Sequence, residues 1–302
     1  MDILFETISR SWEITKLSFS VIKKDKEMLL FPLLAGIFSI IFILTMLFPS
    51  IISSFMKGIG PGSYGITEYL LIFLTYLGLA FIATFFNVCV IYTTKIRFEG
   101  GNAAFWESIN FARSKIGLIF AWSVIAATVG LILRLIDNIA ERAGESGRMV
   151  LNILTSILGM MWSIITIFVV PAMVYHNLGP MDAIKKSVET LKKTWGESLI
   201  RYFGLGLIQF LFFLLGIIAT FILFFVLAGL GPIGIIITVV IAVLYFLGVI
   251  LVFNVANTVF NTALYVYADT GKIPEGYSRE TMQNAFKPRE MRNIRPPTFQ
   301  DM

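Results

Sequence analysis

The chain has 302 residues, of which 57% are hydrophobic and only 14% are charged. Soluble domains contain about 45–50% apolar and about 25% charged residues, and the mean hydropathy of this chain is +0.83. A soluble enzyme would need more polar residues to cover its surface, and a disordered protein would have far fewer apolar ones. We therefore expect an all-α, polytopic membrane protein.

Long uncharged runs mark the expected membrane spans, because a spanning helix needs about 20 mainly apolar residues. The last run is long enough for two spans, and it is interrupted at residues 229–234, where glycines and Pro232 disfavour helix. The sequence thus predicts a bundle of six transmembrane helices. The uncharged runs are 28–56, 69–94, 116–133, 149–181 and 202–268.

The positions of the basic residues predict the orientation in the membrane. Twenty of the 24 lysines and arginines lie in four segments: before the first span, after the second, after the fourth, and after the sixth. Lysine and arginine are enriched in cytoplasmic loops. We therefore expect a multi-pass protein of the cytoplasmic membrane with both termini in the cytoplasm.

Three of these basic segments have apolar residues at spacings of three and four, which favours amphipathic helices lying in the headgroup layer. In the third segment, four lysines lie opposite the apolar face. Side chains of this kind reach anionic lipid, and tryptophan prefers the membrane interface. The predicted headgroup contacts are Trp12, Lys185, Lys186, Lys192, Lys193 and Trp195.

The chain also shows an internal repetition. Each basic surface helix is followed by two spans, which indicates three pseudo-repeats at residues 1–101, 102–178 and 179–271, and a cytoplasmic tail at residues 272–302. The copies enter the membrane from the same side, so they would be parallel repeats. Such repeats are common in transporters, but they are also a simple way to build any membrane bundle.

Amides form a stripe on the sixth span. Asn254, Asn257 and Asn261 follow one another at helical spacing, and Gln209 lies in the fifth span. An amide is costly in hydrocarbon, so these side chains should face water or protein. Two interpretations remain open: a polar path through the membrane, or hydrogen bonds between helices.

Groups suited to catalysis or metal binding are few. Arg134 and Asp137 are three residues apart on one helix face and form a candidate intramembrane ion pair. Asp137 and Glu141 could exchange a proton in a lipid enzyme, but a solvated helix end is the favoured interpretation. With one histidine and one cysteine in the chain, we expect no metal site, no cofactor and no enzymatic activity.

One stretch has the features of a known family. Residues 162–206 contain the run VPAMVYHNLGPMDAIKKSVETLKKTWGESL, and Phe31-Pro32, Leu133-Arg134 and Gly276-Tyr277 accompany it. In these features the chain resembles a family of uncharacterised prokaryotic integral membrane proteins, known as a domain of unknown function. The resemblance implies a six-helix membrane protein and transfers no activity.

Two functions fit the sequence best. The first is a non-enzymatic membrane module that binds anionic lipid or partner proteins, including a second copy of itself, because basic surface helices attract an anionic leaflet. The second is a transporter or channel for a small solute, with its polar path along the sixth span. Nucleic acid is not an expected partner, because the basic residues are distributed as the membrane orientation requires.

The predicted orientation is testable with a reporter fused after Met302. An enzyme that is active only in the cytoplasm should be active in this fusion, whereas one that requires export should be inactive. Export of the fused reporter would contradict the predicted topology.

Overall fold

The computed structural model describes residues 2–57, 66–142, 144–195, 205–275, 277 and 282. The regular structure in these residues is helical throughout, which confirms the all-α class. The α-helices are α1 (Asp2–Lys24), α2 (Leu30–Lys57), α3 (Ile66–Phe98), α4 (Phe105–Ser114), α5 (Ile116–Arg142), α6 (Glu145–Thr166), α7 (Val169–His176), α8 (Pro180–Trp195), α9 (Leu205–Leu227) and α10 (Pro232–Thr270).

Within the described residues, six segments are long and apolar enough to cross a membrane, as the sequence predicts. The break expected at residues 229–234 separates α9 from α10, and Gly231 adopts a positive φ of 61° there. The fourth span is not continuous, because its helix is interrupted between α6 and α7. The six spans are Lys26–Met46, Tyr69–Phe98, Ile116–Arg142, Gly147–His176, Ile208–Leu230 and Pro232–Thr270.

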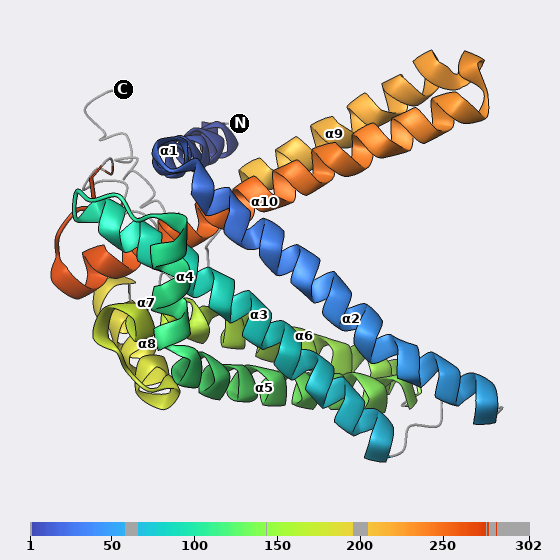
Figure 1. Cartoon of the computed structure of the whole chain (residues 1–302), viewed down its shortest axis with the longest axis horizontal. Helices are drawn as coiled ribbons and strands as arrows, with labels where there is room; N and C mark the ends of the chain where they lie inside the picture. The colour runs from blue at the N-terminus through green and yellow to red at the C-terminus, as the bar shows by residue number, and fades with distance from the viewer. Residues whose placement is uncertain are drawn as a thin grey trace, which may run out of the picture.

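The spans form two arms that diverge from a common head (Figure 1). The main arm consists of α2, α3, α5 and α6, which pack side by side in that order, and the hairpin arm consists of α9 with the first part of α10. The head contains α1, α4, α7 and α8 together with the second part of α10. Helix α1 packs on both α9 and α10.

The tightly packed core of the protein lies in the head. Phe31, Phe168, Phe260 and Tyr265 are fully buried, and residues 253–268 of α10 supply much of the same cluster. Large apolar side chains along both arms are instead exposed. In a bilayer these side chains face lipid, where apolar exposure costs little. The head is therefore the part in which side-chain packing specifies the structure.

The length of α10 explains how one helix belongs to both the hairpin arm and the head. Its 39 residues extend for about 58 Å at 1.5 Å per residue, nearly twice the ~30 Å of the hydrocarbon layer. The first part of α10 is thus sufficient to span the membrane, and the second part continues into the head.

The two helices of the hairpin arm are held together by close contacts. The hydroxyl of Tyr245 donates a hydrogen bond of 2.9 Å to the carbonyl of Phe212, and its ring lies over Gly216, where a Cβ atom would be 2.2 Å from the ring carbon Cε1. At the turn, a Cβ atom on Gly234 would be 2.0 Å from the carbonyl oxygen of Leu227. Glycine at these positions allows α9 and α10 to approach closely.

A Gly234→Ala substitution should destabilise the protein by about 1–3 kcal/mol, because the added methyl group collides with backbone that cannot move aside. Thermal unfolding of the purified protein in detergent measures this loss. Gly229→Ala is the matched control, since a Cβ atom there meets nothing within 4 Å. Equal stability of the two variants would contradict the turn geometry.

Candidate functional site

Each surface helix of the head buries one serine. Ser18 in α1, Ser108 in α4 and Ser187 in α8 are all 0% exposed. Ser18 shares a hydrogen bond of 3.1 Å with the hydroxyl of Tyr277, and Ser108 shares one of 2.7 Å with Thr93 of α3. A small polar residue at these positions lets each helix lie close to the spans while its hydroxyl remains paired.

Ser187 occupies the interruption of the fourth span. Pro171 has no N–H group, so the carbonyl of Ile167 loses its helical partner and the helix breaks before this proline. The hydroxyl of Ser187 donates a hydrogen bond of 2.6 Å to the carbonyl of Ile165 and accepts one of 3.3 Å from the N–H of Phe168. A side chain of α8 thus satisfies backbone groups that the break would leave unpaired.

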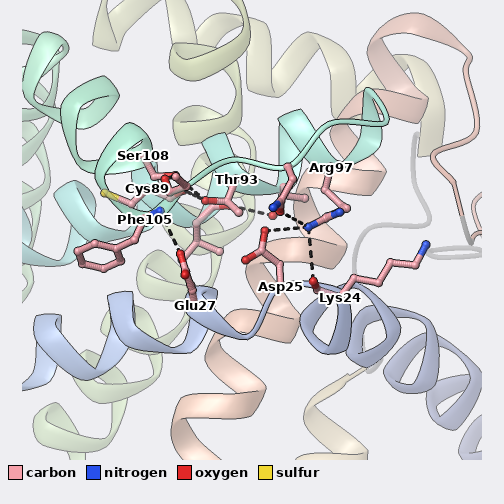
Figure 2. A network of polar contacts seen from close by, with 12 residues as sticks. Lys24, Asp25, Glu27, Cys89, Thr93, Arg97, Phe105 and Ser108 are labelled. Carbon is pink, nitrogen blue, oxygen red and sulfur yellow. Dashed lines mark hydrogen bonds and ion pairs between the residues drawn. The ribbon is translucent and has the colours of Figure 1, made fainter.

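An ion pair joins the ends of α1 and α3 (Figure 2). The guanidinium of Arg97 lies 3.1 Å from a carboxylate oxygen of Asp25 and also donates to Asn102 and to the carbonyl of Lys24. Burial raises the pKa of Asp25, although Arg97 acts in the opposite direction. Beside this pair, the carboxylate of Glu27 accepts a hydrogen bond of 3.0 Å from the N–H of Phe105, the first residue of α4.

A second ionic cluster joins α7, α8 and α10. Asp269, in the last turn of α10, lies 2.6 Å from Lys186 Nζ and 2.9 Å from His176 Nε2. The ring of His176 also contacts the fully buried Tyr265. Sequence reasoning did not single out Asp269, because its partners lie 83 and 93 positions away in the chain.

The predicted headgroup contacts fall into two groups. Lys186 is ion-paired with Asp269 and Lys185 with Asp182, at 3.6 Å, whereas Lys192 and Lys193 are exposed and have no ion pair among the described residues. Trp12 is exposed on α1, and the side chain of Trp195 lies outside the described part. The contacts themselves stay a prediction. Trp106, exposed on α4, was missed, although tryptophan in a basic surface helix could have indicated it.

The buried face of α8 includes small residues. Ala183, Ser187 and Leu191 are buried, while Met181 is exposed. Small residues permit a close approach where α8 packs on the spans.

The amide stripe of the sixth span lies along α10 at its junction with the main arm. Asn254 is exposed, and Asn257, Asn261 and Gln209 are half-buried. On the same face, Thr258 donates a hydrogen bond of 3.1 Å to the side-chain oxygen of Asn87 in α3. The stripe therefore borders a contact between helices.

Arg134 and Asp137 are half-buried in α5, and no ion pair joins them in the structure as described. Their pairing stays a prediction. Among the described residues, no group of three or more histidine, cysteine or acidic side chains is placed to hold a metal ion.

These features define a polytopic membrane protein with six apolar spans and a packed, polar head. The chain belongs to a family of unknown function, DUF6159, whose model matches residues 66–275. This match confirms the resemblance to an uncharacterised membrane family. No curated protein matches the chain.

Removing Arg97 should destabilise the protein more than removing the charge of Asp25. Arg97→Met leaves a buried carboxylate without its cation, a loss of about 3–5 kcal/mol, whereas in Asp25→Asn the guanidinium keeps Asn102 and the carbonyl of Lys24, at a cost of about 1 kcal/mol. Chemical or thermal unfolding in detergent measures both losses.

The pH dependence has a defined sign. The folded-state pKa of Asp25 is already raised, and removal of Arg97 raises it further. A raised carboxyl pKa destabilises the fold above that pKa, so the deficit of Arg97→Met should shrink as the pH falls toward about 4, the ordinary range for aspartate. A deficit that grows on acidification would contradict the assignment.

Proposed function

We propose that the protein is a non-enzymatic module of the cytoplasmic membrane, whose head binds anionic lipid headgroups. The observation that carries this proposal is the placement of α8. Its buried face rests on the spans, and the exposed Lys192 and Lys193 lie in its last turn, which ends at Trp195. Basic side chains near an anionic leaflet contribute about 1 kcal/mol each.

Other exposed cations of the head support the same function. Lys23 and Lys26 lie where α1 joins the start of the first span, and neither has an ion pair among the described residues. Together with the segregation of basic residues to one side of the spans, they favour an inward-facing head and cytoplasmic termini.

The proposal includes an organisation in three similar units, residues 1–101, 102–178 and 179–271. Its support is the shared burial of Ser18, Ser108 and Ser187, one in each surface helix. Ile14 and Ile22 are buried one turn to either side of Ser18. Ala183 and Leu191 are likewise buried one turn to either side of Ser187.

The alternative function is a small-solute transporter with a path along the amide stripe. The half-buried amides of Asn257 and Gln209 favour it, but transporter sites generally lie near the bilayer midplane. The sixth span begins at Pro232, and Asn254 lies 22 residues further along. This is about 33 Å of helix, which exceeds the thickness of the whole hydrocarbon layer. The position of the stripe thus supports interhelical contacts over a path.

The lipid proposal is tested with a Lys192→Gln/Lys193→Gln double variant. Wild-type protein purified from vesicles of phosphatidylcholine and phosphatidylglycerol should retain an excess of phosphatidylglycerol, measured by lipid mass spectrometry. At low salt the variant should lose up to about fivefold of this enrichment per lysine, and added salt should reduce the difference.

Arg142→Gln/Arg148→Gln is the matched control. These exposed arginines lie near the turn between α5 and α6, at the end of the main arm that is remote from the head. It should leave the enrichment unchanged. An absent lipid preference in wild-type protein, or an equal loss in the control, would exclude the lysines of α8 as the binding surface.

A further inference from the structure

An exposed stripe on α10 begins at Asn254 and extends toward the hairpin turn. Asn254 is exposed and has no hydrogen-bond partner among the described residues. The residues that continue its helix face, at alternating steps of four and three, are all large, apolar and 45–62% exposed. These residues are Ile250, Leu247, Val243, Val240 and Ile236.

The amide lies one helical turn from a contact between α10 and the main arm. Toward the head, on the same face, Thr258 donates a hydrogen bond to Asn87 of α3. In the other direction Ile250 is 45% exposed, and the hairpin arm as a whole diverges from α2 and α3 (Figure 1). Asn254 is therefore the last polar residue of this face before the exposed apolar stripe begins.

The depth of Asn254 defines its chemical surroundings. With Pro232 at one boundary of the hydrocarbon layer, about 33 Å of helix brings Asn254 to the opposite boundary, on the side of the head. The ester carbonyls of phospholipids lie at this level, and they are hydrogen-bond acceptors. An unpaired amide donor at this level has a hydrogen-bond partner if a lipid lies against this face of α10.

The composition of the stripe favours lipid over a second copy of the protein. Helices that pack closely in membranes use small residues at the contact, and the stripe from Ile236 to Ile250 has none. Helix α2 likewise exposes large apolar side chains, including Leu33, Ile37, Ile40 and Leu44. Such surfaces suit flexible acyl chains.

We propose that a phospholipid of the leaflet on the side of the head is held against the exposed face of α10 that begins at Asn254. Its acyl chains lie along the α10 stripe, and its ester carbonyl accepts a hydrogen bond from the Asn254 amide. This site goes beyond the proposed binding of anionic headgroups, because it requires no headgroup charge.

Native mass spectrometry of protein purified from phosphatidylcholine nanodiscs tests the site. Wild-type protein should retain a tightly bound phosphatidylcholine, and Asn254→Leu should reduce its occupancy about threefold, as expected for one intramembrane hydrogen bond. Asn254→Gln should restore it. Asn152→Leu is the matched control, since Asn152 is an exposed amide on α6 of the main arm.

A neutral lipid makes the two proposals separable. Loss of retention in Asn254→Leu but not in the lysine variant supports this site alone, whereas retention of phosphatidylglycerol without phosphatidylcholine overturns this site and leaves the headgroup proposal standing. Equal occupancy in Asn254→Leu and wild type also overturns it.

A photoreactive benzoylphenylalanine at Leu247 identifies the occupant directly. After transfer of the protein to detergent, irradiation should attach phospholipid at this position, and the same probe at the exposed Phe221 of α9 should attach little. A crosslink from position 247 to a second copy of the chain, or equal lipid labelling at both positions, would refute the proposal.

Discussion

The structure depends on how the head holds together helices that lipid does not drive together. Within the hydrocarbon layer, apolar side chains gain little from leaving lipid for protein, so helix association needs close packing or hydrogen bonds. In this chain the fully buried side chains gather instead around residues 253–268 of α10, where α1, α3, α7 and α8 surround that helix. The arms extend from this point and expose apolar surface to lipid.

Polar contacts in the head fix the arrangement that apolar packing alone would leave ambiguous. Each of them joins different helices: Asp25 with Arg97, Ser187 with the break at Pro171, and Asp269 with Lys186 and His176. A buried polar group without a partner is costly, so each pair tolerates one register of its helices. The head can therefore remain ordered while the arms adapt to the bilayer.

The sequence predicted the features that a single helix determines. The six spans and the break at residues 229–234 follow from local composition, and the family follows from one continuous stretch. Membership of the head core was not predictable in the same way, because apolar content is equally high in the arms. The buried serines and the partners of Asp269 are visible only when separate segments of the chain are brought together.

Paired substitutions in the head and in an arm test this account most directly. Phe260 is fully buried in the head part of α10, and Phe225 is 62% exposed near the end of α9. Phe260→Ala should lower the free energy of unfolding in detergent by about 3–5 kcal/mol, as large cavities in a packed core do, and Phe225→Ala should change it by less than about 0.5 kcal/mol. Similar losses in the two variants would contradict the claim that the head is where the fold is specified.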